Sequence, residues 1–208
     1  MAAKRTPNRR SFFSGLKAEF NVARLTWLTN VRSALELRAA FVTQIIGMML
    51  NDCSFVFIWL LFFHVMGTVN GWSGSQTLAL LGFNVLAFGL TFGFAGGSLW
   101  LPRYVEKGTF DGFLLSPRNL YIRTVTSRFD LPALGDASLG LILIAIFVVQ
   151  THSWLAPLWF LAMLPAAIMI FLSFSVTIGT ASFFLPDANH TVMSLFKVFL
   201  NPTMYPSA

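Results

Sequence analysis

Two aspartates interrupt long apolar segments of the sequence and are its clearest candidates for chemistry. Asp52 follows Asn51 within residues 41–65, and Asp136 lies about one turn inside residues 131–151. An ionised carboxylate at the centre of a bilayer costs about 3 kcal/mol, so each must face another helix, face a water-filled cavity or carry a proton. The pair could relay a proton or a cation, or could fix the packing of two helices. We favour packing.

A serine in a short pattern is the second candidate. Residues 71–74 read Gly-Trp-Ser-Gly, the G-x-S-G context in which intramembrane serine proteases place a nucleophile, and His64, His152 and His190 are possible bases. Four common residues match such a pattern easily by chance, and we favour an ordinary Gly/Ser turn at Ser73. The histidines lie on separate segments without ligand-like spacing, so we expect no metal site.

Motifs for ATP hydrolysis are missing from the sequence. It contains no G-x-x-x-x-G-K-[ST] loop, which would bind the phosphates of ATP. Two motifs of other enzymes, H-E-x-x-H of metalloproteases and G-x-S-x-G of serine hydrolases, do not occur either. We therefore expect no enzymatic activity and no cofactor on this chain.

The composition is that of an integral membrane protein. Of its 208 residues 56% are hydrophobic and 11% are charged, and the mean hydropathy is +0.70, whereas a soluble domain carries about 25% charged residues. The net charge of +6 would suggest nucleic acid in a soluble chain. Here the basic residues gather before residue 39 and in one internal loop, so we expect the membrane, not nucleic acid, to explain them. The single cysteine, Cys53, allows no internal disulfide.

Charge distribution predicts how the chain is oriented. Residues 98–128 form the long polar interruption of the apolar region and hold Arg103, Lys107, Arg118, Arg123 and Arg128. Basic loops stay on the cytoplasmic side. The short turns 68–75 and 152–157 carry no Asp, Glu, Lys or Arg, which suits the outer side. We expect a multi-pass protein of the plasma or inner membrane with a cytoplasmic N-terminus.

Apolar runs long enough to cross a bilayer, about 20 residues, predict an all-α polytopic bundle. Four full spans are expected at 41–65, 77–97, 131–151 and 158–185, followed by a shorter fifth segment at 192–204. Asp130 and Pro132 should cap and begin the third span, and Pro165 should kink or begin the fourth. In the second span a small-residue ridge for close helix contact is formed by Gly89, Gly93 and Gly97.

Residues before the first span have a helical period. Apolar positions recur every three or four residues from Phe13 to Leu35, and basic residues fall largely on another face. We divide the chain into a cytoplasmic tail with an amphipathic helix at 1–38 and a transmembrane domain at 39–208. The helix lies in the headgroup plane or covers a cytoplasmic partner, and the pattern suits both.

Two short helices are expected within the loop 98–128. The first, at 102–107, should end at Gly108. The second should have Thr109 as its N-cap and stop at Ser116-Pro117. Phe110, Phe113 and Leu114 share one face of it. This face either rests on headgroups or is presented to a soluble partner.

Residues 107–119 and 127–136 resemble the corresponding loop and helix of one subgroup of type-2 ATP-binding-cassette (ABC) transporter permeases. Residues 32–38 and 71–73 are also similar to that subgroup. The resemblance implies a six-helix subunit with an amphipathic connecting helix, a coupling helix in the first cytoplasmic loop and a hairpin before the last span. It assigns coupling to residues 108–118, namely Gly108, Phe110, Asp111, Gly112, Phe113, Leu114, Pro117 and Arg118.

The same resemblance implies an exporter whose ATP and Mg²⁺ are held by a separate cassette ATPase. Two permease subunits, identical or different, would pair. We expect the chain to stop before the hairpin and the sixth span of that family. A secondary transporter or channel using Asp52 and Asp136, and a protease acting through Ser73, remain alternatives.

Overall fold

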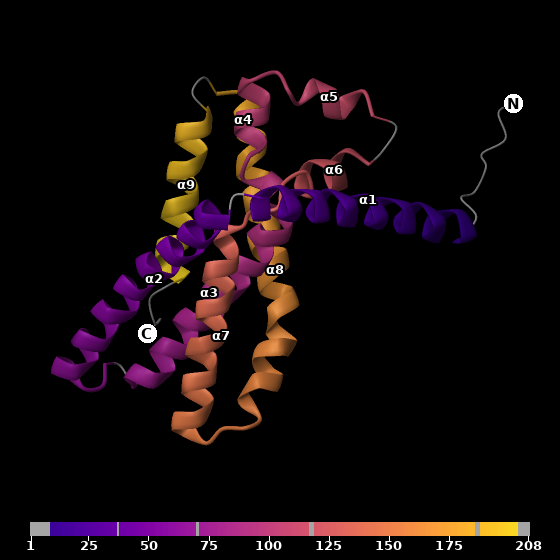
Figure 1. Cartoon of the computed structure of the whole chain (residues 1–208). Coiled ribbons are helices and arrows are strands. Elements are labelled where there is room, and N and C mark those ends of the chain that lie inside the picture. The colour runs from indigo at the N-terminus through magenta and orange to yellow at the C-terminus, as the bar shows by residue number, and fades with distance from the viewer. Residues whose placement is uncertain (1–8, 37, 70, 117–118, 186–187, 204–208) are drawn as a thin grey trace, which may run out of the picture.

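The computed structural model describes residues 9–36, 38–69, 71–116, 119–185 and 188–203, and this part of the chain is almost entirely helical (Figure 1). Apart from an isolated bridge between Val69 and Trp72, the described residues contain no strand pairing. The all-α prediction is confirmed. In chain order the helices are α1 (Arg9–Glu36), α2 (Arg38–Met66), α3 (Gly74–Ala95), η1 (Gly96–Ser98), α4 (Leu101–Glu106), α5 (Asp111–Leu114), α6 (Leu120–Val125), α7 (Pro132–Thr151), α8 (Ala156–Thr180), η2 (Ala181–Phe183) and α9 (Ala188–Thr203).

Among the described residues, four helical segments are long and apolar enough to cross a membrane. They are Arg38–Met66, Gly74–Glu106, Pro132–Thr151 and Ala156–Phe183. These correspond to the four predicted spans, so the polytopic bundle is confirmed as well. Helix α9 has 16 residues and is not among them, in keeping with the short fifth segment.

Helices α3 and α7 form the closest helix pair of the fold and run side by side (Figure 1). A Cβ built on Gly82 would lie 2.7 Å from the Leu143 Cβ, and one on Gly140 would lie 2.6 Å from the Gly82 carbonyl oxygen. At Gly89 it would overlap the backbone nitrogen of Ala137. Lipid tails are as apolar as leucine, so helices in a bilayer associate where small residues let their backbones meet.

The glycine ridge predicted on α3 is uneven. Gly97 lies against another segment, because a Cβ there would overlap the carbonyl oxygen of Thr124 at the end of α6. Gly93 has room to spare, since its Cβ would be 4.0 Å from that of Ala133. The four-residue spacing therefore identified the correct helix, but the tight contacts stand at Gly89 and Gly97.

An aromatic cluster holds α9 against α3 and α8. Phe92 is fully buried and packs edge-to-face with Phe196 of α9, with ring centroids 5.4 Å apart. Phe174 of α8 and Phe199 of α9 stack at 3.5 Å. Lys197 is exposed. Helix α9 is thus fixed through its phenylalanines, although it is too short to span comfortably.

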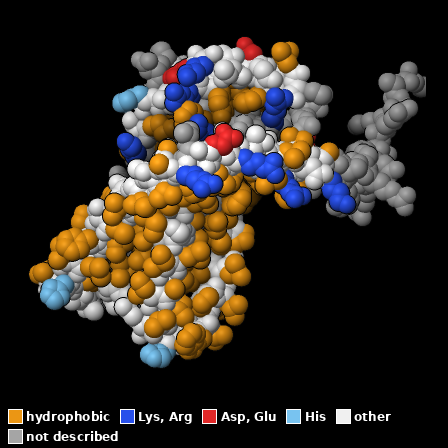
Figure 2. Space-filling view, viewed as in Figure 1, with side chains coloured by type: hydrophobic (Ala, Val, Ile, Leu, Met, Phe, Trp, Pro, Cys, Tyr) orange, Lys and Arg blue, Asp and Glu red, His pale blue; other side chains and the backbone are white. Residues whose placement is uncertain are grey.

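Helix α1 lies across one end of the long helices (Figure 1). Ala23 is buried there, and the Trp27 ring meets Phe94 of α3 edge-to-face at 5.2 Å. On the face shown in Figure 2, basic side chains gather on and above α1, and the region below it is covered by hydrophobic side chains. This is the arrangement expected of a helix at a membrane surface.

Two predicted helix caps are wrong. Helix α7 begins at Pro132 after Leu131, which is already helical and makes no side-chain cap bond. Asp130 instead donates its backbone N–H to the Gly93 carbonyl at 3.1 Å. Helix α5 begins one residue later than the cap at Thr109 requires, and the Thr109 hydroxyl donates to the Tyr104 carbonyl at 3.3 Å. The cap positions fall instead on Leu131 and Phe110, whose side chains have no oxygen to accept a hydrogen bond.

The α3–α7 contact predicts different tolerances at two positions one turn apart. Gly89→Ala should lower the melting temperature of the detergent-solubilised protein by several degrees, because overpacking of this kind costs about 1–3 kcal/mol. Gly93→Ala should leave it nearly unchanged, because that site accepts a methyl group at ordinary distance. Equal melting temperatures for the two variants would contradict the packing described here.

Candidate functional site

The described part of the loop 98–128 contains three short α-helices, α4, α5 and α6. Helix α4 ends beside Gly108, which has the left-handed φ of 66° that glycine adopts without strain. The chain then turns back, and the Phe110 N–H donates to the Tyr104 carbonyl at 3.1 Å. Helix α5, with Asp111 in its first turn, is thereby fastened to α4.

The two phenylalanines of α5 and its N-cap face inward. Phe113 packs edge-to-face with Tyr104 at 5.3 Å, and the Arg123 guanidinium lies 5.3 Å from the Phe113 centroid. Phe110 packs against Phe183 of η2 at 5.2 Å. Both phenylalanines are partly buried within the chain itself. Both rings are therefore engaged by other residues of this chain, and a contact of Phe113 with a partner stays a prediction.

The apolar side chains that do point outward are leucines. Leu114 is 56% exposed and Leu115 is 87% exposed. The two stand at the tip of the loop, next to the exposed Asp111 and Gly112. The predicted coupling residues Pro117 and Arg118 lie outside the described residues.

Two acidic side chains tie the loop to distant helices. The Glu106 carboxylate accepts a hydrogen bond from the Asn189 N–H in the first turn of α9, at 2.8 Å. The Glu19 carboxylate of α1 accepts from the N–H of Asn119, the N-cap of α6, at 3.3 Å. Sequence patterns could not reveal these bonds, because the partners are far apart in the chain.

Arginines flank the point where the loop enters the apolar region. The guanidinium groups of Arg128 and Arg103 lie 3.8 and 4.6 Å from the Trp100 ring centroid. Burial raises the pKa of Asp130, and the charge of Arg128 partly opposes that shift. This pairing of tryptophan with arginine suits the boundary between headgroups and hydrocarbon.

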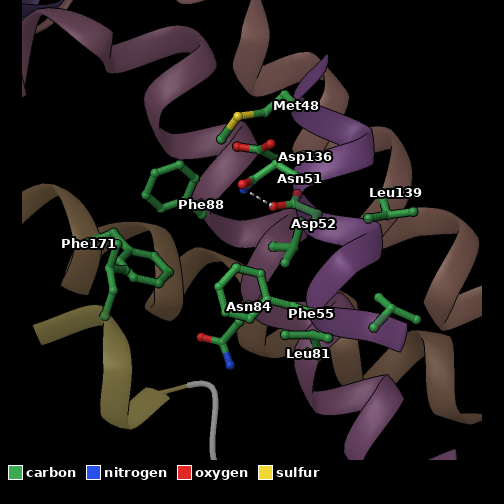
Figure 3. A pocket seen from close by; sticks show the side chains of 13 residues that line it. Met48, Asn51, Asp52, Phe55, Leu81, Asn84, Phe88, Asp136, Leu139 and Phe171 are labelled. Carbon is green, nitrogen blue, oxygen red and sulfur yellow. Dashed lines mark hydrogen bonds between the residues drawn. The ribbon is translucent and has the colours of Figure 1, made fainter. Parts of the chain in front are cut away.

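The intramembrane polar residues come together (Figure 3). Asp52 of α2 and Asp136 of α7 line one pocket, and the Asn51 amide donates to the Asp52 carboxylate at 3.4 Å. Asp136 is only 2% exposed. Sequence analysis named both aspartates, but only the fold shows that they share a pocket whose other walls include Phe88 and Phe171.

Ser73 has a structural role in the fold. It is the N-cap of α3, where its hydroxyl accepts from the Gln76 N–H at 3.4 Å and the Gln76 side chain accepts from the Ser73 N–H at 3.0 Å. This is a capping box. No histidine of the described chain hydrogen-bonds to Ser73.

A family model described as ABC-2 family transporter protein matches residues 48–208. The matched region begins within α2 and includes the loop, the acidic pocket and the described part of α9. No curated protein and no solved structure matches the chain significantly.

The inward packing of Phe113 predicts a change in loop order. Phe113→Ala removes an edge-to-face contact and a cation–π contact, each of which contributes about 0.5–1.5 kcal/mol. Trypsin should therefore cleave after Lys107 or Arg123 several-fold faster in this variant than in the wild type. Leu115→Ala is the matched control and should be cleaved at the wild-type rate. Equal rates for Phe113→Ala and the wild type would show that these contacts do not order the loop.

Proposed function

Because the chain belongs to the ABC-2 family of transporter proteins, we propose that it is the membrane-spanning permease subunit of an ATP-driven exporter. The observation that carries this proposal is the loop 98–128, whose packed helices present Leu114 and Leu115 at an ordered tip. Exposed leucines on an ordered element are suited to insertion into an apolar groove on a soluble partner. ATP and Mg²⁺ would be bound by that partner, a cassette ATPase, because this chain has no P-loop.

Contacts within the loop support a role in coupling. The close approach of Gly97 to Thr124 joins the loop to the end of α3, and Glu106 joins it to the first turn of α9. The Phe110–Phe183 contact joins it to the end of α8. A displacement of the tip would thus be transmitted to three helices of the bundle, because packed elements move as units.

A single subunit would form half of the translocation path. Helix α2 buries little of its apolar surface within the chain: Leu50, Phe57 and Ile58 are each 60% or more exposed. A second permease subunit, identical or different, would complete the path.

In the proposed orientation the protein lies in the plasma or inner membrane, with α1 and the loop on the cytoplasmic side. Most of the basic residues lie in the loop and on α1, and Figure 2 shows that basic side chains gather at one end of the molecule. Retention of basic loops in the cytoplasm supports this orientation.

Cysteine labelling tests the orientation. In a Cys53→Ser background, Thr68→Cys in the turn before α3 should react with an impermeant thiol reagent on intact cells. Thr109→Cys in the loop should react only after the membrane is opened. Both threonines are exposed, so access decides the result. Reaction of Thr109→Cys alone on intact cells would reverse the orientation.

Charge placed at the loop tip tests the coupling proposal. Leu115→Asp should lower the ATP hydrolysis activity that copurifies with the permease at least tenfold, because loss of an anchoring side chain costs about 2 kcal/mol or more. Thr109→Asp introduces the same charge at an exposed polar position of the loop and should retain that activity. Full retention in Leu115→Asp would remove the support for docking through this tip.

A further inference from the structure

A cavity of about 150 Å³ lies between α2, α3, α7, α8 and α9. Its polar side chains are Asn51, Asp52, Asn84 and Asp136. Aromatic rings complete the wall, and Figure 3 shows Phe55, Phe88 and Phe171 around the carboxyl groups. Carboxylates and aromatic faces are thus brought together inside the apolar region.

The two carboxyl groups interact with each other, but one oxygen of each remains without a hydrogen bond. The Asp136 Oδ1 and Asp52 Oδ2 atoms are buried without a hydrogen bond, and Asp136 as a whole is 98% buried. No lysine, arginine or histidine is among the described residues that line the cavity. A buried acid without partners is costly, so these oxygens are suited to a ligand that enters the cavity.

Charges beyond the cavity wall do not neutralise the pair. Asp130 is the further group that acts electrostatically on Asp136, and it is also acidic. Arg128 acts on Asp130, and its guanidinium lies against the Trp100 ring. The cavity therefore attracts positive charge.

The wall chemistry argues against a metal ion. The described residues contain no group of three or more His, Cys, Asp or Glu side chains that could hold one. Calcium and magnesium need about six oxygen ligands, and this wall is largely aromatic and aliphatic. A carboxylate combined with aromatic faces is the recognition chemistry of substituted ammonium groups.

The size of the cavity limits how much of a ligand it can enclose. Drug-sized molecules occupy pockets of about 300–1,000 Å³, and 150 Å³ accommodates a head group only. Phe55 lines the cavity and is 45% exposed, so the cavity reaches the surface of the chain beside α2. The rest of a ligand would lie along the exposed apolar face of that helix.

We propose that this cavity binds the ammonium head of an organic cation, with Asp136 and Asp52 as counter-ions and Phe55 at the entrance. Transport of such cations rests on the proposed permease function. Binding itself does not, because it requires no ATPase.

The test measures binding of dodecyltrimethylammonium to the full chain, purified in an uncharged maltoside detergent. Asp136→Asn should weaken binding at least tenfold, since the variant loses the buried countercharge. Phe55→Leu should weaken it about two- to fivefold, because a cation–π contact near the surface contributes about 0.5–1 kcal/mol. Asp111→Asn makes the same change at an exposed acid of the loop and should bind as the wild type does.

Further arms keep the test decisive. The neutral isostere of dodecyltrimethylammonium, with carbon in place of nitrogen, should not bind in the cavity. Binding of this isostere as tight as that of the cation would overturn the proposal. So would absence of wild-type binding, or proton uptake by the pair without cation binding. If the Asp136→Asn variant aggregates, binding to the Asp52→Asn variant is compared with binding to the wild type instead.

Tetramethylammonium, which has no alkyl chain, distinguishes the source of the ligand. Affinity equal to that of dodecyltrimethylammonium indicates a water-soluble cation, and weaker affinity indicates a cation that enters from the lipid. Leu115→Asp should bind like the wild type, so failure of coupling and failure of this site are distinguishable.

Discussion

The close contact between α3 and α7 is the constraint on which the other features of the fold depend. Gly82 and Gly89 on one helix meet Gly140 and Ala137 on the other at distances that exclude a methyl group. In a bilayer no hydrophobic effect drives such a pair together, so complementary backbone surfaces must do so. This contact turns Asp136 toward α2 and places the end of α3 beneath α6. The acidic cavity and the position of the loop both follow from it.

Much of this architecture could be predicted from the sequence, because hydrocarbon length and charge asymmetry leave few choices. The four spans, the helix of residues 9–36 and the end of α4 shortly before Gly108 follow from apolar length, periodicity and glycine chemistry. What could not be predicted depends on contacts between distant segments. The cap position of α7 falls on Leu131 and not on Asp130, whose backbone N–H bonds to the Gly93 carbonyl. Gly93 itself fits the spacing of the ridge but meets Ala133 only at ordinary contact distance.

The loop shows the same limit at the candidate site. Periodicity placed Phe110, Phe113 and Leu114 on one face of a short helix, whereas in the structure the two rings are half-buried and Leu114 is exposed. Tyr104, Arg123 and Phe183 cover the two rings. Leu115, which the sequence pattern did not single out, is the most exposed apolar side chain there. Likewise, the pattern identified Asp52 and Asp136 but not the aromatic residues that surround them.

The bond from Glu106 to the start of α9 bears on how such subunits can be recombined. The carboxylate supplies negative charge at the end of a helix that carries partial positive charge, and it satisfies an N–H that has no partner within the helix. A chimaera that exchanges residues 98–128 between related subunits would break this contact unless the incoming segment also has an acidic side chain at position 106. The loop and α9 are therefore a single module for protein engineering, although about eighty residues separate them in the chain.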